Sequence, residues 1–472
     1  MSLHDLLPEY SGKINDFTIS SISLDSQEIK KGDLYISLAN DSDQQKKYNQ
    51  EALKKGANCI LTNNKSIENI EKKIIYVSEL KEKLGFLSNR FFENPSKKIE
   101  VFGLTGTNGK SSVSYYLFQL FSQIKKDIGL ISSIKLKESG IYNSKLTTPD
   151  VFTLNKILSN FLLEKKKAAI FEVSSHGIDQ ERIAGIDFDY GCFTSFSRDH
   201  LDYHSSINKY AKVKESFFLN NKFKGAVINI DSKVGKKIFS NSHDFVSVSR
   251  KNKKSDICIE KNKGKFFIKT PWGHVNLPDR IFADHTMVNI AAALGLFCLS
   301  SKKPNLNKLN LKKIYDLPGR FQKINIDSNK YLYIDYAHTP EALENILKSL
   351  KKKYHGSLIC LFGCGGGRDQ GKRSLMGAIA DSFADKIILT NDNPRFENPK
   401  VIIEDILEGI KNQKKVEIIN DRTKAIKFGL KLLSKEKEGS VLLLAGKGHE
   451  SNQEINNKTI ESNDYEIVRS FI

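Results

Sequence analysis

The sequence lacks any apolar run that approaches the roughly 20 residues needed to cross a membrane. Its first ten residues, MSLHDLLPEY, also lack the basic start and apolar centre of a signal peptide. The six cysteines show no metal-like spacing, and reduced thiols in a cytosolic protein are the simplest account of them. These absences predict a cytoplasmic protein with no membrane span, and we expect it to be a monomer.

Arginine is much rarer than lysine among the 74 basic residues, although the formal net charge is +19. A nucleic-acid-binding face concentrates charge in one stripe, preferably with arginine and aromatic residues. Here Lys, Ile and Asn are abundant in every region, as in KKK at residues 165–167. AT-rich coding explains this even spread better than a binding surface does, so we predict no nucleic-acid partner.

Residues 101–121, VFGLTGTNGKSSVSYYLFQLF, resemble a phosphate-binding loop but depart from its usual pattern. The pattern G-x-x-x-x-G-K-[ST] ends correctly at Gly109-Lys110-Ser111, yet its first position holds Leu104. Either this is a nucleotide site with a different loop pattern, or it is a tight turn that carries a surface lysine.

The sequence around this loop favours a nucleotide site. Residues 101–105 predict a buried strand, and residues 111–121 predict a helix with one apolar face. A strand, a glycine-rich turn and a helix bring backbone N–H groups and the positive helix end to one point, where a polyphosphate binds. Lys110 would reach the β- and γ-phosphates, and the Ser111 hydroxyl could bind magnesium.

The chain is too long for one hydrophobic core, and three blocks can be distinguished. Residues 1–95 form a small mixed block, residues 96–318 alternate strands with helices, and residues 319–472 alternate more regularly. This alternation predicts an α/β fold with mostly parallel sheets.

Polar clusters follow the predicted strands of the last block. They are His338, Arg368, residues 392–395 and residues 447–450. In open α/β sheets ligands bind at the carboxyl ends of the strands, so these clusters predict a binding site. The alternative is ordinary turn chemistry, because Gly, Asn and Asp are also turn residues.

The middle block contains carboxylates, histidines and a lysine in two stretches. These are Glu172, Ser174, His176, Gln180 and Arg182, then Asp199, His200, Asp202, His204 and Lys214. Magnesium prefers oxygen ligands and keeps several waters, so one or two carboxylates beside a phosphate loop suffice. Zinc is disfavoured because no cysteine accompanies the histidines. Each histidine taken alone is more often structural.

Eight motifs together resemble one known family, the Mur ligases. In order they are GLTGTNGKSS, TTPD, EVSSHGIDQERI, SRDHLDYHSSINKYAKVK, LPGRFQ, DYAHTPEAL, DNPRFENP and GKGHE. The resemblance covers nearly the whole chain and is closest to the members that add diaminopimelate. In this family the loop has the pattern T-G-T-N-G-K-[ST], so Leu104 is not a defect.

The resemblance implies an ATP-dependent ligase of bacterial peptidoglycan synthesis. Such an enzyme joins meso-2,6-diaminopimelate to the D-glutamyl carboxylate of UDP-N-acetylmuramoyl-L-alanyl-D-glutamate through an acyl phosphate. It also implies three domains: a UDP-substrate-binding domain at residues 1–95, a P-loop-type ATPase domain at 96–318, and a Rossmann-like amino-acid-binding domain at 319–472.

The resemblance further assigns residues to ATP and magnesium. The triphosphate residues are Gly106, Thr107, Asn108, Gly109, Lys110, Ser111 and Ser112, and the adenosine residues are Asn289, Arg320 and Asp335. Glu172 and His200 join Ser111 as magnesium ligands. Lys214 matches the lysine that the family carbamylates with carbon dioxide, and nearby Lys212 is its competitor.

Two more sets of residues are implied for the other substrates. The UDP-dipeptide residues are Ser26, Thr147, Thr148, Ser174, Gln180 and Arg182. The diaminopimelate residues are Arg368, Asp392, Asn393, Pro394, Arg395, Gly446 and Glu450. The chain departs from the family at Leu146, where asparagine is usual, and in the loop at residues 40–48.

Three alternatives remain open at this stage. The chain could be the homologue that adds L-lysine, in which Arg395 would face a cation. It could be a ligase like folylpolyglutamate synthetase, against which DNPR and the N-terminal block argue. It could also be an inactive ATP-binding scaffold, although the metal and lysine positions are present.

Overall fold

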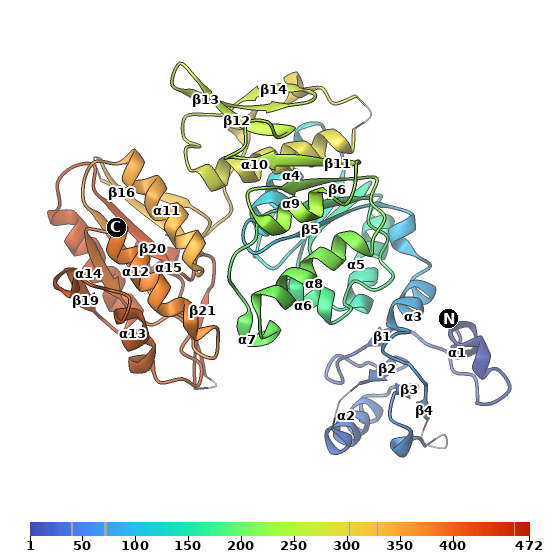
Figure 1. Cartoon of the computed structure of the whole chain (residues 1–472). Helices are drawn as coiled ribbons and strands as arrows, with labels where there is room; N and C mark the ends of the chain where they lie inside the picture. Colours follow the sequence, from blue (N-terminus) through green and yellow to red (C-terminus); the bar gives the residue numbers. More distant parts are fainter. Residues whose placement is uncertain (39–40, 70–72, 302, 328, 457) are drawn as a thin grey trace. The chain divides into compact units, whose positions relative to one another are not determined.

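The computed structural model describes residues 1–38, 41–69, 73–301, 303–327, 329–456 and 458–472. The chain divides into two compact units, residues 1–103 with 127–189 and residues 104–126 with 190–472. Strands and helices alternate along both units (Figure 1). The predicted α/β fold is confirmed. The exact domain boundaries stay a prediction.

The N-terminal part of the first unit contains a four-stranded parallel sheet. Its strands are β1 (Ile22–Ser23), β2 (Leu34–Ser37), β3 (Cys59–Thr62) and β4 (Ile74–Tyr76), in that order. Its helices are α1 (Leu3–Leu6), α2 (Ser42–Lys54) and α3 (Leu84–Phe91). Asp41 caps α2 by accepting hydrogen bonds from two backbone amides, which explains why the helix begins there.

The rest of the first unit positions Glu172 and the residues that follow it. Strand β6 (Ile128–Ser132) pairs in parallel with β7 (Ile141–Asn143) and with β8 (Ala168–Glu172). Helix α5 (Val151–Leu163) begins at the capping residue Asp150, and α6 (Ser175–Asp179) begins at Ser174. Strand β8 is fully buried, so Glu172 lies at the carboxyl end of a core strand.

The chain passes from the first unit into the second within strand β5 (Glu100–Thr105). In the second unit β9 (Tyr190–Phe193), β10 (Gly225–Asn229), β11 (Phe245–Ser249) and β12 (Ile257–Asn262) pair in parallel. Strands β13 (Lys265–Thr270) and β14 (Gly273–Asn276) then pair antiparallel.

Five helices accompany these strands. They are α4 (Lys110–Gln123), α7 (Leu201–His204), α8 (Ile207–Leu219), α9 (Lys233–Phe239) and α10 (Asp284–Leu299). Helix α10 is apolar on nearly every side and packs against α4 (Figure 1).

The C-terminal part of the second unit is a doubly covered sheet. Its strand order is β15 (Gln322–Asp327), β16 (Lys330–Asp335), β20 (Val441–Ala445), β17 (Leu358–Phe362), β18 (Lys386–Leu389) and β19 (Val416–Ile418). Only β15 runs antiparallel to its neighbour. Successive residues of the central strands belong to two different cores, which places helices on both faces.

One face is covered by α11 (Pro340–Lys353), α12 (Arg373–Phe383) and α13 (Pro399–Leu407). The other is covered by α14 (Arg422–Lys435) and α15 (Asp464–Arg469). A two-stranded antiparallel hairpin, β21 (Asn452–Ile455) and β22 (Lys458–Glu461), follows β20. The predicted Rossmann-like arrangement of this part is confirmed.

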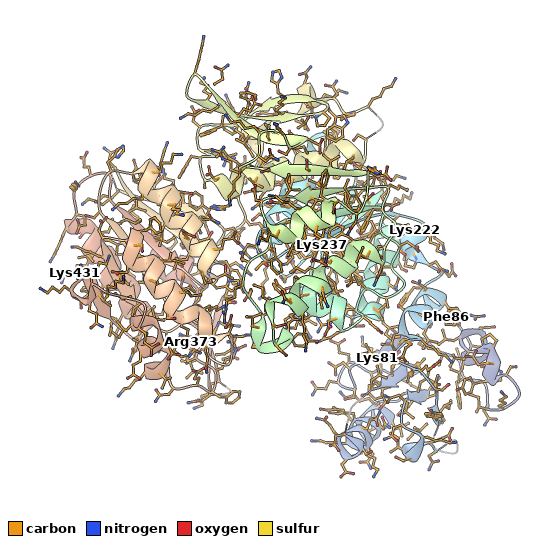
Figure 2. All side chains as sticks on the ribbon, in the orientation of Figure 1. Lys81, Phe86, Lys222, Lys237, Arg373 and Lys431 are labelled. Atoms are coloured by element: carbon orange, nitrogen blue, oxygen red, sulfur yellow. The ribbon has the colours of Figure 1, made fainter. Side chains whose placement is uncertain are left out.

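The structure also describes the cysteines, the length of the helices and the distribution of lysines, on which the predictions from composition depend. All six cysteines are buried and free. Among the described residues, no helix combines the length and the apolar character needed to cross a membrane. The labelled lysines come from separate segments, such as Lys81 before α3, Lys237 on α9 and Lys431 on α14 (Figure 2). Their spread agrees with the even charge seen in the sequence.

Candidate active site

The glycine-rich loop lies between β5 and α4, as the sequence predicts. Gly106 has φ +147° and Gly109 has φ +91°, and Gly109 caps the helix. A Cβ at Gly106 would lie 2.0 Å from Thr194 Oγ1, and one at Gly109 would lie 2.6 Å from Asn289 Oδ1. Both positions therefore require glycine, by backbone conformation and by close approach. Leu104 is fully buried within the strand, which explains the missing first glycine.

Ser195, which follows β9, and the loop's own Lys110 hold this loop in shape. Thr107 N donates to Ser195 O at 2.9 Å, and Asn108 N donates to Ser195 Oγ at 2.9 Å. Lys110 Nζ donates to the carbonyl oxygens of Gly106 and Thr107, both at 2.9 Å. These bonds fix the loop at the start of α4, where the helix dipole attracts anions.

Lys214, on α8, lies beneath the same loop. Its Nζ donates to Gly106 O at 2.8 Å, and only 1% of the residue is exposed. Burial, together with the charge of Lys110, holds the pKa of Lys214 well below its ordinary value. Its competitor Lys212 is exposed on the same helix. The structure therefore separates the two lysines clearly.

His200 lies just before α7 and faces a buried carboxylate. Its Nε2 is 3.4 Å from Asp199 Oδ2, and His338 Nε2 lies 3.4 Å from the same oxygen. Burial alone would raise the pKa of Asp199, but His338, His200 and Lys372 hold it well below its ordinary range. The sequence placed Asp199 beside His200 but gave no sign that His338 meets it.

Glu172 lies in the first unit, and 2% of it is exposed. Among the described residues no three His, Cys, Asp or Glu side chains cluster as a metal-binding group. Magnesium in nucleotide sites is commonly held by one or two protein oxygens plus phosphate and water. The carboxylate of Glu172 and the hydroxyl of Ser111 are ligands of that chemical kind.

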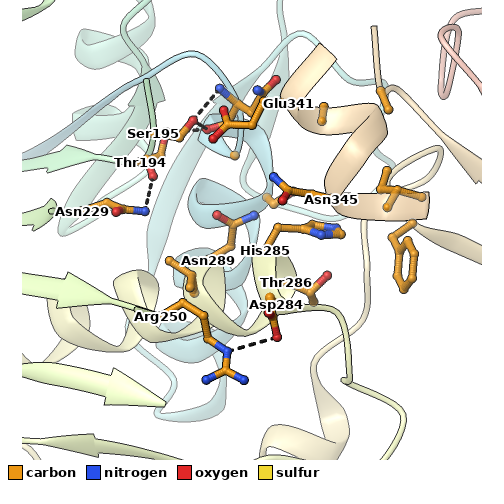
Figure 3. A pocket seen from close by; sticks show the side chains of 18 of the residues that line it. Thr194, Ser195, Asn229, Arg250, Asp284, His285, Thr286, Asn289, Glu341 and Asn345 are labelled. Carbon is orange, nitrogen blue, oxygen red and sulfur yellow. Dashed lines mark hydrogen bonds and ion pairs between the residues drawn. The ribbon is translucent and has the colours of Figure 1, made fainter. Parts of the chain in front are cut away.

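A cavity of about 260 Å³ opens beside the loop (Figure 3). Its walls come from the loop, from the start of α10, and from the segments around β16 and α11. The three residues predicted to hold adenosine, Asn289, Arg320 and Asp335, all line it. The structure brings them together with Asn108, Gly109 and Ser112 of the loop.

Charge and stacking shape one wall of this cavity. The guanidinium of Arg320 lies 4.2 Å from the ring centre of Tyr336, a cation–π contact. Burial raises the pKa of Asp335 to about 6, although Arg320 and the backbone amides of Phe321 and Ala337 act against the shift. A carboxyl and a stacked guanidinium suit the polar atoms of a nucleoside.

Several residues of this cavity were missed in the sequence. His285 on α10 and Asn345 on α11 line it beside the predicted Asn289 (Figure 3). Burial lowers the pKa of His285 to about 4, so its ring is neutral at physiological pH. The motif DYAHTPEAL, which precedes Asn345, was the available signal, since Thr339 caps α11 and fixes where that helix begins.

The residues predicted to bind the UDP-dipeptide lie in the first unit. Thr148 Oγ1 donates to Glu172 O at 3.0 Å and accepts from Ser174 N at 2.9 Å. Arg182 Nη1 donates to Thr148 O at 3.0 Å, and its Nη2 donates to Gln180 Oε1. The Thr148 hydroxyl thus holds the segment after β8 in place, next to Thr147 and the exposed Leu146.

Ser26 lies in the N-terminal sheet region, where its Oγ donates to Glu51 Oε2 at 2.6 Å. It is close in sequence to an open pocket lined by Leu24, Tyr35, Ile36, Leu38, Asp41, Gln44 and Tyr48. The segment at residues 40–48, where the sequence departs from the family pattern, falls partly in this region. Residue 40 lies outside the described residues, and most of the remainder is the first half of α2.

Residues 392–395 follow β18 and meet the end of β20. Asn393 Nδ2 donates to Glu450 Oε2 at 2.9 Å, and Tyr336 Oη donates to Glu450 Oε1 at 3.3 Å. A Cβ at Gly446, which has φ +106°, would lie 2.8 Å from Asp392 Oδ2. The predicted diaminopimelate residues Asp392, Asn393, Gly446 and Glu450 are therefore neighbours, and Pro394 is buried among them.

The two arginines of this set border the same glycine. Arg395 Nη1 donates to Gly366 O at 2.9 Å, and a Cβ at Gly365 would lie 3.0 Å from Arg395 Nη1 and 3.6 Å from Arg368 Cγ. Arg368 Nη1 lies 3.4 Å from Asp202 Oδ2. Both cations thus belong to one region at the carboxyl end of the sheet.

Comparison with known proteins agrees with this geometry. Residues 104–297 match the Mur ligase middle domain, and residues 319–448 match the Mur ligase, glutamate ligase domain. The chain belongs to the Mur ligase family. Over 470 residues, 96% of each chain, it is 35% identical to the UDP-N-acetylmuramoyl-L-alanyl-D-glutamate--2,6-diaminopimelate ligase of Coxiella burnetii.

Solved structures give the same result. A structure of a UDP-N-acetylmuramoyl-L-alanyl-D-glutamate--2,6-diaminopimelate ligase superposes with a TM-score of 0.65 and 27% identity, covering 100% of this chain and 98% of that one. The MurF ligase of Thermotoga maritima, solved with ADP, shares the fold at 17% identity, with a TM-score of 0.64 and coverage of 91% and 94%. The family resemblance seen in the motifs is confirmed, and ATP is the co-substrate.

Proposed function

We propose that this chain joins meso-2,6-diaminopimelate to the D-glutamyl carboxylate of UDP-N-acetylmuramoyl-L-alanyl-D-glutamate at the expense of ATP, in peptidoglycan synthesis. The observation that carries the proposal is the 35% identity over 96% of the chain to a ligase of that name. The phosphate loop, the cavity beside it and the cluster of polar residues around 392–395 support the proposal, because this reaction needs sites for a triphosphate, a nucleoside and an amino acid.

The chemistry follows from the weakness of a carboxylate as an electrophile. ATP transfers its γ-phosphoryl group to the D-glutamyl carboxylate, the amine attacks the resulting acyl phosphate, and phosphate leaves. Such transfer depends mainly on positioning and on neutralising charge. Lys110 offsets charge on the γ-phosphate, residues 106–112 orient the triphosphate, and Asn289, Arg320 and Asp335 hold the adenosine.

Magnesium, when bound, neutralises charge on the phosphates and would be held by Ser111, Glu172 and His200. Lys214 is the residue we assign to carbamylation. Its amine is buried at the loop, where burial and the charge of Lys110 lower its pKa. A lower pKa favours the neutral amine, which is the form that captures carbon dioxide. The resulting carbamate would place an anion beneath the loop that can accept a hydrogen bond from Lys110 or bind magnesium.

The pocket at residues 392–395 selects the amino acid by its distal end. Diaminopimelate carries a carboxylate and an ammonium there, whereas lysine carries only the ammonium. The Arg395 fork suits the carboxylate, and Asp392, Asn393 and Glu450 offer oxygens to the ammonium. Arg368, Pro394 and Gly446 complete the pocket, and lysine would bring a cation toward Arg395.

The remaining assignments complete the proposal. Ser26, Thr147, Thr148, Ser174, Gln180 and Arg182 contact the UDP-dipeptide. The domains are residues 1–95, 96–318 and 319–472, and the enzyme works as a cytoplasmic monomer. Size-exclusion chromatography with light scattering tests the last point, and a dimer would contradict it.

One amino-acid panel tests the function. Phosphate release is measured with ATP, magnesium and the UDP-dipeptide, together with meso-diaminopimelate, L-lysine or glutamate, and Lys110→Ala serves as the inactive control. We expect turnover with diaminopimelate alone, and loss of its preference over lysine in Arg395→Ala. Equal use of lysine would favour the lysine-adding alternative. Turnover of glutamate only when a folate replaces the UDP-dipeptide would favour a folylpolyglutamate-type ligase, and no turnover with either acceptor would indicate a scaffold.

A further inference from the structure

The hairpin β21–β22 is attached to the turn that carries Arg395. Arg395 N donates to Glu454 O at 2.9 Å, Asn456 N donates to Arg395 O at 2.8 Å, and Glu454 N donates to Asn393 Oδ1 at 2.9 Å. The buried side chain of Gln453 also donates to Asp392 O. Because Arg395 has φ +52°, a conformation that non-glycine residues rarely adopt, these bonds hold it in place.

This attachment places a carboxylate beside the Arg395 guanidinium. Glu454 Oε2 lies 3.0 Å from Arg395 Nε. The Glu454 side chain is 57% exposed and that of Arg395 is 27% exposed, so the glutamate can leave for water while its backbone stays fixed. No substrate residue or catalytic role is assigned to Glu454 by the motifs, since it lies outside GKGHE.

We propose that Glu454 competes with the distal carboxylate of the amino-acid substrate for the guanidinium of Arg395, and so weakens the preference for diaminopimelate over lysine. The proposal rests on the assignment of Arg395 as the residue that binds that carboxylate. When diaminopimelate binds, its distal carboxylate takes the place of the Glu454 carboxylate at Arg395, and the Glu454 side chain rotates outward into solvent. When lysine is present, Glu454 stays paired, so Arg395 is not left without a partner.

The physical consequence concerns how selectivity arises. A site rejects a wrong ligand most strongly when a buried charge is left uncompensated. Glu454 removes that penalty for lysine and adds a competitor for diaminopimelate. Removing its charge should therefore improve the binding of diaminopimelate and worsen that of lysine, while the reacting amine at the other end of the substrate is unaffected.

The test compares Glu454→Gln with Glu461→Gln, which makes the same charge change on β22 of the same hairpin. KM and kcat are measured for diaminopimelate and lysine in wild type, both variants, Arg395→Ala and the double variant Arg395→Ala/Glu454→Gln. Because exposed pairs contribute modestly, we expect Glu454→Gln to lower KM for diaminopimelate about two- to fivefold. Its kcat should not change, its KM for lysine should rise, and Glu461→Gln should match wild type.

Three results separate the possibilities. An unchanged or raised KM for diaminopimelate in Glu454→Gln overturns the competition, and a raised value would mean that Glu454 orients Arg395. An effect of Glu454→Gln that persists in the Arg395→Ala background also overturns it, because the two residues then act independently. If Arg395→Ala alone leaves selectivity unchanged, Arg395 does not bind the carboxylate, and the assignment beneath this inference fails instead.

Discussion

At the residue scale, two lysines meet at one carbonyl oxygen. Lys110 Nζ and Lys214 Nζ donate to Gly106 O at 2.9 and 2.8 Å, and two ammonium groups so close repel each other. Burial distinguishes the two lysines: Lys214 is enclosed and its pKa is lowered, while Lys110 is partly exposed at the helix start. A buried amine with a lowered pKa beside a phosphate loop suits modification by carbon dioxide.

Lys214→Ala should lower kcat by about 100-fold or more, because removing one preorganised electrostatic partner from such a site typically costs that much. Short carboxylic acids such as formate should restore part of the activity by replacing the carbamate. Lys212→Ala, on the exposed face of the same helix, is the control. Initial rates with and without formate provide the measurement. An unmodified Lys214 in active enzyme, seen by ¹³C NMR after incubation with ¹³CO₂, would contradict the assignment.

Asp335 provides a test by pH. Its pKa is raised to about 6 in the folded protein, against 3.8 ordinarily. Because the folded protein holds this proton more tightly than the unfolded chain does, the protonated carboxyl contributes stability. That contribution is fully present below about pH 4 and is lost as pH rises through about 6. The loss corresponds to about 3 kcal/mol for a shift of roughly two units.

Asp335→Asn removes this titration. The unfolding free energy of wild type minus that of Asp335→Asn should therefore fall by about 3 kcal/mol between pH 4 and pH 7. Urea unfolding at each pH, without nucleotide, measures it. A difference that stays constant across this range would show that Asp335 ionises normally.

At the element scale, one arginine on α12 joins α13 and the segment that follows residues 392–395. Arg373 has a fully buried side chain and is labelled on α12 in Figure 2. Its Nη1 donates to Glu397 Oε1 at 2.6 Å and to Asp405 Oδ2 at 2.7 Å, and its Nη2 donates to Glu397 Oε2 at 2.7 Å. Glu397 follows Arg395 by two residues, so this network supports the turn that we propose to bind diaminopimelate.

Arg373→Met should destabilise the protein by about 3 kcal/mol, because it leaves two carboxylates without their buried cation. It should also raise KM for diaminopimelate while leaving KM for ATP unchanged. The control is Lys348→Met on α11, which breaks an exposed pair with Glu344 and should cost less than about 0.5 kcal/mol. Equal effects of the two variants in urea unfolding would contradict the role of Arg373.

At the scale of the whole molecule, we expect the charge of +19 to act on stability. Basic residues spread over all parts of the chain repel one another when salt is low, which disfavours the compact state. The Debye length shortens from about 30 Å at 0.01 M salt to about 8 Å at 0.15 M, so ordinary salt screens most of this repulsion.

The melting temperature should therefore rise between 10 and 150 mM NaCl, by about 1 °C if screening contributes about 1 kcal/mol, because the entropy of unfolding grows with chain length. Sodium fluoride and potassium chloride should give the same rise, which distinguishes screening from binding of a particular ion. Differential scanning fluorimetry measures it. A lower melting temperature at higher salt would show that attractive surface pairs outweigh the net repulsion.

Local motifs made much of the fold and site predictable. The strand at residues 101–105, the glycine turn and α4 follow from apolar periodicity and from backbone conformations that only glycine adopts readily. The regular alternation after residue 319 likewise predicted the parallel sheet and placed the clusters at 338, 368, 392–395 and 447–450 at its carboxyl edge. The adenosine residues Asn289, Arg320 and Asp335 came from resemblance and do line one cavity.

The sequence by itself determined the family, the ATP chemistry and the identity of the motif residues, because each depends on residues close together along the chain. Tertiary structure alone decided which of these residues meet. It placed His338 against Asp199, enclosed Lys214 but not Lys212, and brought Glu454 to Arg395. Those contacts join residues far apart in sequence or depend on burial, and burial, which sets pKa values and the strength of ion pairs, exists only after the chain has folded.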